Sequence, residues 1–446
     1  MIAFKLLLHS SLTKSRSPTA WGTPACIYLP TSTNDVAFAI KVLGFTNSPY
    51  AIRSGGHSPL AGWANIDDGV LISMSDVTEL NYDNITQIAT VGYGNRWGDV
   101  YEYLQGFGRI VVGGRVPEVG LALTIGGGLS HLTNRFGFSC DNVISFTVVL
   151  ANASVVSASA QTNSDLFFAL KGGTSNFGVV TRMSLKTYPS GKAWGGLVVY
   201  NNSYQDQYMS ALEAYQKQGQ VNDTSTALLT YLAINNQTIF ATYVSFGDEV
   251  KPSAFQPFYD IPVVEDSTAL YDSFIDLANN VQINYAVPRW AWGSTTLYLD
   301  EQAYVDLGHI STNESLKVRG IEGGSYVLMP QPISTSMITP SQKTGGNALG
   351  LTPRPQMWFS LNIGYELASD DDKVNKIMEE SIAELETLTK ARGLYDEFIF
   401  LNDAAPSQSP IRGYGADNYK KLEAVSQKYD PSGMFQHQVP GGFKIK

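Results

Sequence analysis

The segment Arg53-Ser54-Gly55-Gly56-His57-Ser58 directly follows the apolar run Tyr50-Ala51-Ile52. A short apolar run that stops at consecutive glycines predicts a β-strand ending in a tight loop. Consecutive glycines let neighbouring backbone N–H groups converge on anionic oxygens, and the two serines add hydroxyl donors. The segment therefore predicts a binding loop, which suits a pyrophosphate-bearing ligand better than a single phosphate.

Two more glycine loops follow before residue 180. Gly126-Gly127-Gly128 comes after Leu123-Thr124-Ile125, and Gly172-Gly173 leads into Asn176-Phe177-Gly178 and the run Val179-Val180. Each loop alone is typical of an ordinary tight turn. Three of them close together predict a long ligand, such as a dinucleotide, that lies along the backbone.

Other common binding motifs are not met. The run Gly92-Tyr93-Gly94-Asn95-Arg96-Trp97 has tryptophan where the Rossmann fingerprint needs its third glycine. The chain has neither a P-loop motif nor the Gly-x-Ser-x-Gly elbow of hydrolases. Two distant cysteines, Cys26 and Cys140, and five scattered histidines form no metal-binding spacing, so no metal is predicted.

Composition limits the class of protein. The chain has 446 residues, of which 43% are hydrophobic and 16% charged, and this excludes wholesale disorder. The net charge is −10 and no dense cluster of Lys or Arg occurs, so neither nucleic acid nor an anionic membrane is expected as a partner. No apolar run reaches the ~20 residues of a membrane-spanning helix.

The residue composition and the apolar periodicity change along the chain and divide it into three parts. Together these parts predict an α+β protein. Residues 20–190 hold the glycine loops and short β-branched runs, with helical periods between them. Residues 191–395 alternate strands with helices, the clearest being Asp370–Ala391, and predict a sheet covered by helices. Residues 396–446 predict a strand at Phe398–Asn402 and a helix at Ala416–Tyr429.

Several motifs carry a family resemblance because they occur in one order. They are RSGGHS, VGYGNRWGDVY, GGRV, GGGLS, FGFSCDNV, DLFFALKGGTSNFGVVT and, near the end, YGADNYKKLEAVSQKYDPSGMFQ. They resemble the PCMH-type FAD-binding domain of the vanillyl-alcohol-oxidase superfamily, and most closely the berberine-bridge-enzyme-like oxidoreductases of fungal secondary metabolism. The resemblance covers residues 20–190 and 396–446. It implies a two-subdomain FAD-binding domain, a substrate-binding domain with an antiparallel sheet at 191–395, and a C-terminal segment that returns to the FAD-binding domain.

The resemblance implies FAD as the cofactor, bound covalently through His57 at the 8α-methyl carbon. A loop histidine that only hydrogen-bonds a phosphate is the alternative. Some relatives add a second link from a cysteine in Gly-Arg-Cys; here Val116 follows Gly114 and Arg115, so only one link is expected. The implied FAD contacts come from glycine loops and their neighbours: Arg53, Ser54, Gly55, Gly56, His57, Ser58, Val119, Gly120, Gly126, Gly127, Gly128, Ser130, Asp141, Asn142, Gly178 and Val179.

The catalytic base departs from the family pattern. Relatives often carry Asn-Tyr-Ala-Asp near the C-terminus, with the tyrosine as base, whereas this chain has Asn402-Asp403-Ala404-Ala405. A carboxylate against an apolar flavin ring would have a raised pKa and would act as a base. The alternative is that Asp403 is a solvated loop residue and that the base lies elsewhere or is absent. Tyr414, in the following Gly-Tyr-Gly, is a weaker candidate for the base.

The resemblance implies an oxidase acting on a small molecule. A base removes an O–H or N–H proton, hydride passes to flavin N5, and O2 reoxidises the flavin to give hydrogen peroxide. Two alternatives stay open: an FAD-bound cyclase or isomerase without net redox chemistry, and a non-catalytic flavin-binding scaffold. The resemblance implies an alcohol, an amine or a natural-product intermediate as substrate. The aromatic residues of the second part predict an uncharged, partly apolar small molecule, unless they are plain core: Trp290, Trp292, Tyr298, Tyr326, Trp358 and Tyr365.

Location is barely addressed by the sequence. Residues 1–15 only loosely resemble a signal peptide, because Lys5 and His9 break a short apolar core. The family slightly favours the secretory pathway, and the compartment stays unknown.

Overall fold

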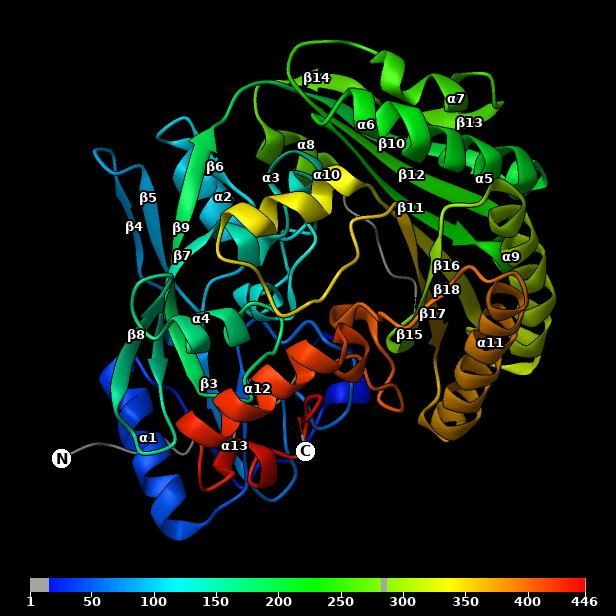
Figure 1. Ribbon diagram of the computed structural model, residues 1–446. Coiled ribbons are helices and arrows are strands. Elements are labelled where there is room, and N and C mark those ends of the chain that lie inside the picture. The colour runs from blue at the N-terminus through cyan, green and yellow to red at the C-terminus, as the bar shows by residue number, and fades with distance from the viewer. Residues whose placement is uncertain (1–15, 282–286, 446) are drawn as a thin grey trace.

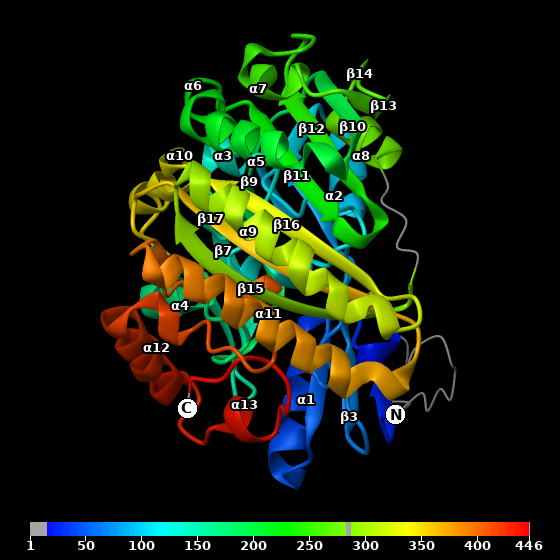
Figure 2. The same cartoon turned by 90° about the vertical axis from the view of Figure 1, so that its right-hand side faces the viewer.

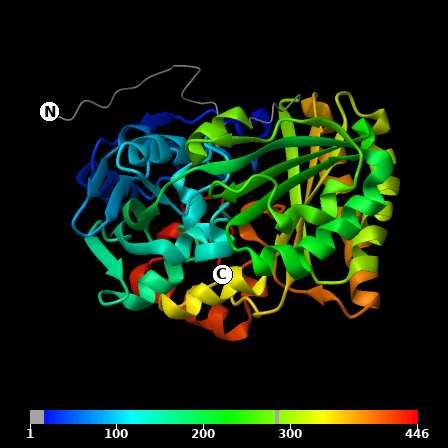
Figure 3. The ribbon, with the colours of Figure 1, turned by 90° about the horizontal axis from the view of Figure 1, so that it is seen from above.

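The computed structural model describes residues 16–281 and 287–445, so the signal-like stretch at 1–15 lies outside the described residues. The chain forms two lobes side by side (Figures 1 and 3). The first lobe holds the N-terminal strands together with the C-terminal helices, and the second is built on one large sheet. Among the described residues, no helix is long and apolar enough to cross a membrane.

A small parallel sheet positions the first glycine loop. Its strands are ordered β1 (Cys26–Tyr28), β3 (Val70–Ser73) and β2 (Tyr50–Arg53), and helix α1 (Thr33–Thr46) connects β1 to β2. The Ser32 side chain caps α1 by accepting the backbone N–H of Asp35. Because β2 ends at Arg53, the loop 54–58 begins at the carboxyl end of a parallel strand, where ligands commonly bind in open α/β sheets.

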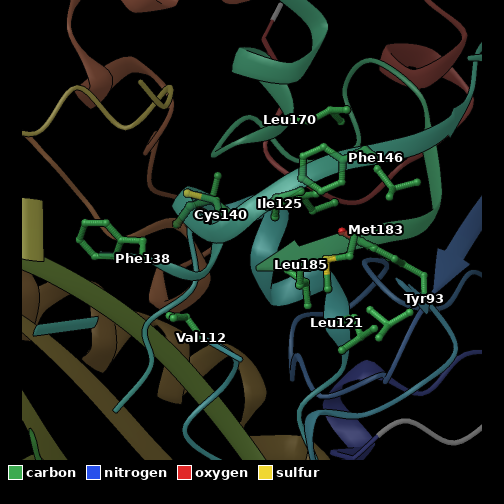
Figure 4. Close-up of a cluster of buried hydrophobic side chains, with 14 of the residues drawn as sticks. Tyr93, Val112, Leu121, Ile125, Phe138, Cys140, Phe146, Leu170, Met183 and Leu185 are labelled. Atoms are coloured by element: carbon green, nitrogen blue, oxygen red, sulfur yellow. The ribbon is translucent and has the colours of Figure 1, made fainter. Parts of the chain in front are cut away.

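A second sheet of the first lobe is antiparallel and carries the core. Its strands are ordered β4 (Leu80–Asp83), β5 (Ile88–Gly92), β9 (Val179–Pro189), β7 (Val143–Val149) and β8 (Val155–Ser159), and β6 (Arg109–Val111) pairs with β9. Helices α2 (Trp97–Gln105) and α4 (Ser164–Leu170) belong to this lobe. The apolar residues ahead of Gly126 form a 3-10 helix, η3 (Leu121–Gly126), which buries Leu121 and Ile125 beside Met183 and Leu185 of β9 (Figure 4).

The second lobe is a nine-stranded antiparallel sheet. Its main path is β13 (Val263–Asp266), β10 (Ala193–Asn201), β12 (Thr238–Phe246), β11 (Thr226–Ala233), β16 (Ser325–Ile333), β17 (Gln356–Tyr365), β15 (Arg289–Tyr298) and β18 (Tyr395–Asp396), with β14 (Ala269–Tyr271) beside β10. Helices α5 (Gln205–Ala214), α9 (Glu301–Glu314) and α11 (Asp371–Ala391) cover its outer face (Figure 2). The predicted antiparallel sheet covered by helices is confirmed.

Helix α11 shows why this cover forms. Its apolar positions recur every three to four residues, and Val374, Ile377, Met378, Ile382 and Leu385 are all buried against the sheet and α9. The helix ends at Ala391, two residues before a glycine in the left-handed region. The helix therefore corresponds closely to the one predicted from the sequence.

The C-terminal part returns to the first lobe, where α12 (Ala416–Tyr429) packs on α4 and α13 (Met434–His437) follows. The predicted strand at Phe398–Asn402 is wrong, because pairing stops with β18 and residues 401–403 form a 3-10 helix, η12 (Leu401–Asp403). The side chain of Asp396 accepts the backbone N–H of Phe398 at 2.8 Å and turns the chain out of the sheet. Phe398 and Phe400 pack on Trp358 instead, with ring centroids 4.9 and 4.8 Å away.

A strap of residues 334–350 leaves the sheet after β16 and crosses the first lobe before β17 (Figure 1). Its helix α10 (Thr335–Ile338) packs on α3 (Thr133–Phe136). The hydroxyls of Ser334 and Ser336 both donate to Asn134 Oδ1, at 3.0 and 2.6 Å. The 334–350 strap therefore ties the two lobes together on one side.

Candidate functional site

A cavity of about 850 Å³ lies between the first lobe and the inner face of the large sheet. One wall is made by the glycine loop 54–58, by Val119 and Gly120, and by the segment 400–403. The opposite wall is made by β11, β12, β15, β16 and β17. The volume lies within the range typical of ligand and cofactor sites.

The first glycine loop presses directly against Gly120. A Cβ atom added to Gly55 would lie 2.5 Å from the Cα of Gly120, and one added to Gly120 would lie 2.3 Å from the nitrogen of Gly55. A guanidinium nitrogen of Arg96 donates to the Gly55 carbonyl at 3.3 Å. The two backbone segments therefore form one continuous wall, and their close contact requires glycine at both positions 55 and 120.

Backbone donors of this wall point to an anionic ligand. Within the part of the chain that the structure describes, the N–H groups of residues 55–58 have no protein acceptor. Ser54 contributes its hydroxyl to the Tyr93 carbonyl at 2.6 Å, so it braces the loop. Free N–H groups on a cavity wall suit the oxygens of a diphosphate, which is the ligand that the sequence predicts.

His57 lies on the same wall. Burial, followed by the positive charges of Arg16 and Arg96, lowers the pKa of His57 to about 3. An Arg16 nitrogen lies 3.5 Å from Nδ1 of the ring, and the Trp292 ring centroid lies 6.4 Å from that of His57. The imidazole is therefore neutral at physiological pH, which keeps a nitrogen lone pair available for bonding.

Asp403 faces the cavity from η12 and is only 8% exposed, so it is not a solvated loop residue. Gln331 of β16 donates its Nε2–H to Asp403 Oδ2 at 2.8 Å. Burial raises the pKa of Asp403, while the charge of Arg115 and the hydrogen bond from Gln331 lower it. The arrangement places a buried, hydrogen-bonded carboxyl group on the cavity wall.

None of the three glycines of the triple-glycine loop, Gly126, Gly127 and Gly128, lines the cavity. A Cβ on Gly126 would lie 2.3 Å from Asn402 Oδ1, and the N–H of Gly127 already donates to Thr124. Both Gly127 and Gly172 lie against the side chain of Leu349 from the strap. These glycines admit neighbouring protein segments, and the cavity wall at this loop consists of Leu123, Ile125 and Leu129.

Several other predicted contacts are buried beneath the cavity. Asp141 accepts the Phe138 N–H at 3.1 Å and the Asn347 amide at 2.9 Å, and burial raises its pKa to about 6. Asn142 donates to the carbonyl of Phe138 at 2.9 Å. The remaining predicted residues outside the cavity lining are Arg53, Ser130, Gly178, Val179 and Tyr414.

Tyr414 is buried in the core of the first lobe, where its contacts are with other protein groups. Its hydroxyl donates to the Gly172 carbonyl at 3.1 Å, and burial raises its pKa well above the usual value. It is 2% exposed and stacks beside Phe398. The structure does not bring Tyr414 to the cavity with Asp403.

Sequence reasoning missed part of the wall. Trp63, the pair Thr174-Ser175, and Val439, Gly441 and Gly442 of the C-terminal tail all line the cavity. A Cβ on Gly441 would lie 2.1 Å from the Gly62 carbonyl oxygen, so the tail packs tightly on the first lobe. In the sequence, the glycine pair of Val439-Pro-Gly-Gly-Phe443 could have indicated this close contact.

The sheet wall follows the two-residue period of its strands. Leu229, Tyr231 and Ala233 point inward from β11, as do Val327 and Met329 from β16. Trp290 and Trp292 of β15, Phe240 of β12 and Asn362 of β17 complete this wall. Tyr326, Trp358 and Tyr365 lie in the core, so only the two tryptophans of the predicted aromatic set line the cavity.

No group of three His, Cys, Asp or Glu side chains suited to a metal occurs in residues 16–281 and 287–445. The fold and the cavity define a two-lobed protein in which unpaired backbone N–H groups face a largely apolar sheet wall. Residues 24–159 match the family model described as an FAD binding domain.

Relatives similar in sequence identify the family. Over 439 residues the chain is 44% identical to the bifunctional solanapyrone synthase of Alternaria solani, which covers 98% of this chain and 85% of that protein. It is 34% identical over 429 residues to an FAD-dependent monooxygenase of Arthrobotrys oligospora, covering 96% and 83%. The chain belongs to the same family as these fungal FAD-dependent oxidoreductases.

Solved structures share the fold at lower identity. The 6-hydroxy-D-nicotine oxidase of Arthrobacter nicotinovorans superposes with a TM-score of 0.82 at 20% identity, covering 97% of each chain. The glucooligosaccharide oxidase of Acremonium strictum, described with 6-S-cysteinyl, 8α-N1-histidyl FAD, gives a TM-score of 0.79 at 20% identity, covering 95% of this chain and 92% of that one. These likenesses establish the PCMH-type architecture predicted from the sequence.

Proposed function

We propose that the protein is an FAD-dependent oxidase of a small, partly apolar alcohol, amine or natural-product intermediate. The observation that carries this proposal is the juxtaposition across one cavity of unpaired backbone donors at 55–58, the buried Asp403 carboxyl and an apolar sheet wall. When bound, FAD supplies the redox chemistry, taking hydride from the substrate carbon and passing the electrons to O2 to give hydrogen peroxide.

The chain's own residues bind and orient both molecules. The N–H groups of residues 55–58 hold the diphosphate. Because neither Gly55 nor Gly120 has a side chain, their backbones lie in direct contact and no side chain projects from this part of the wall. The tryptophans of β15 and the aliphatic side chains of β11 and β16 exclude water from the substrate. Asp403 takes the substrate O–H or N–H proton on a carboxylate oxygen, which makes the adjacent C–H bond a better hydride donor.

A covalent link through His57 alone is part of this proposal. The neutral imidazole carries a nitrogen lone pair, and Val116 offers no nucleophile for a second bond. Acid precipitation of the purified protein tests the link directly. We expect the yellow colour to stay with the denatured chain, and colour left in the supernatant would refute the covalent link.

Anaerobic mixing with a panel of neutral primary alcohols and amines tests the oxidase itself. We expect one class of compound to bleach the flavin absorbance and to give stoichiometric peroxide when air is admitted. Asp403→Asn should keep the flavin and slow the bleaching by roughly 10²–10⁴-fold, the usual contribution of a general base. Asp403→Asn with wild-type rates would remove Asp403 from the mechanism.

A second candidate is an FAD-bound cyclase or isomerase with no net redox change. It is favoured by the name of the 44% identical relative, a bifunctional synthase, and by Asp403 in place of the usual tyrosine. Product formation without flavin bleaching under anaerobic conditions would support it.

A further inference from the structure

Gln331 lies on the same strand face as the cavity residues of β16. Ser325, Val327 and Met329 line the cavity, and the two-residue period of the strand continues that face to Gln331. Gln331 itself is 2% exposed, at the inner end of the substrate chamber next to Asp403.

The amide makes two hydrogen bonds of opposite polarity. Arg115 donates from Nη2 to Gln331 Oε1 at 2.6 Å, and Gln331 Nε2 donates to Asp403 Oδ2 at 2.8 Å. A guanidinium only donates and an ionised carboxylate only accepts, so these partners fix the amide orientation. Glutamine is a neutral side chain that accepts from the cation and donates to the anion at once.

We propose that Gln331 is the positioning residue of the base: it couples Arg115 to Asp403, fixes the carboxylate through Oδ2, and leaves Oδ1 to receive the substrate proton. The inference rests on the proposed role of Asp403. The described chain gives Asp403 Oδ1 no partner, and Asp403 lines the cavity, so that oxygen is available to a bound molecule.

The coupling also favours the ionised form of the base. Desolvation of a buried carboxyl group favours its neutral form, and a neutral carboxylic acid cannot accept a proton. The hydrogen bond from Gln331 and the positive charge of Arg115 oppose that effect at Asp403. Without the amide, the charge of Arg115 would still act through space, but Asp403 would lose its hydrogen bond and its fixed orientation.

Other charged groups do not substitute for this pair. The segment η12 that carries Asp403 packs on η3 and on β15. The sequence of η3 has no titratable side chain, and β15 carries only Arg289, ion-paired with helix α11, and Tyr298. The protonation of Asp403 is therefore set mainly by burial, Arg115 and Gln331.

Titration of the Asp403 carboxyl band by infrared difference spectroscopy on the holoenzyme tests the inference without a substrate. The spectrum of Asp403→Asn serves as the blank that assigns the band. We expect Gln331→Met, which keeps side-chain length, to raise the titration midpoint by about one pH unit, the effect of losing one hydrogen bond to a charged group. Arg115→Met should also raise it, and the double variant should fall short of the sum because both act through one amide.

Gln356→Met is the matched control. Gln356 is buried in β17 and also makes two side-chain hydrogen bonds, to Thr352 and Trp358, and neither involves Asp403. It should lower stability comparably and leave the Asp403 midpoint unchanged. An unchanged midpoint in Gln331→Met, or equal shifts in Gln331→Met and Gln356→Met, would overturn the inference; if Gln331→Met does not fold, Gln331→Leu is titrated on the same band and decides in the same way.

The rate of Asp403→Asn tests the proposed function, and the midpoint of Gln331→Met tests the coupling, so the two can fail separately. If Asp403→Asn oxidises substrate at the wild-type rate, Asp403 is not the base, whatever the midpoint does. If Asp403→Asn is slow and Gln331→Met titrates like the wild type, the oxidase proposal stands and the coupling through Gln331 falls.

Discussion

The imidazole of His57 lies beside the Arg16 guanidinium, at 3.5 Å, and this neighbour repels a proton. A histidine that remains neutral on a cavity wall is chemically suited to forming a bond with an electrophilic carbon. The sequence drew attention to His57 through the glycines around it. Its low pKa comes first from burial and then from two arginines, one of them 41 residues earlier in the chain, which no local motif reveals.

His57→Ala should release the flavin from the chain. The remaining wall still offers the N–H groups of residues 55–58, so we expect bound but extractable FAD. Acid precipitation followed by absorbance of the supernatant measures the release. Retention of colour on the denatured variant would show that another residue carries the link.

Gly120→Ala tests the close approach of the two wall segments. The new methyl carbon would lie 2.3 Å from the Gly55 nitrogen, and because backbone cannot move aside cheaply, we expect a loss of about 1–3 kcal/mol in unfolding free energy and weaker FAD retention. Gly191→Ala is the control, since no atom lies within 4 Å of its added Cβ and it has no positive φ. Equal stability and flavin content in both variants would contradict this account of the wall.

At the scale of elements, the triple-glycine loop was recognised from the sequence, but the contacts that its glycines make were not. Gly126 must be glycine because of Asn402, which is far away in sequence, and Gly127 because of its own φ of 104° as well as Leu349. The predicted strand at Phe398–Asn402 failed for a similar reason, since its aromatic side chains pack on Trp358 without strand pairing. Periodicity predicted α11 and α12 well because their burial pattern is local in sequence.

Leu349→Ala should loosen the 334–350 strap. Leu349 is fully buried between Gly127 and Gly172, and these glycines cannot fill the space left by the shorter side chain. We expect a loss of about 2–5 kcal/mol in unfolding free energy, measured by urea denaturation. Leu367→Ala, at a side chain that is 45% exposed, should cost far less, and similar losses in the two variants would refute the packing role.

At the scale of the whole molecule, stability depends on carboxyl groups buried where the lobes meet. Burial raises the pKa of Asp141 to about 6, opposed by the hydrogen bond from Asn347 of the strap and by Lys171. The unfolded value is about 3.9. Because the folded state holds this proton more tightly, the contribution of Asp141 to stability falls as pH rises from about 4 to 6 and is constant above.

Asp141→Asn should remove that dependence. The unfolding free energy of the variant relative to the wild type should increase by at most about 3 kcal/mol between pH 4 and pH 6, then level off. Urea denaturation across this range measures the difference. Asp417→Asn, at an exposed position of α12, should give a difference that does not vary in this way. A flat difference for Asp141→Asn would show that this carboxyl group titrates normally.

The large sheet presents its side chains alternately to the helices and to the chamber, and Leu229, Tyr231, Val327 and Met329 all come from the chamber side. None of these positions belongs to the loops that carry the cofactor-facing backbone. Under the proposed function, exchanging these four side chains should change which molecules are accepted without disturbing the backbone at residues 55–58, so they are the place to begin redesigning specificity.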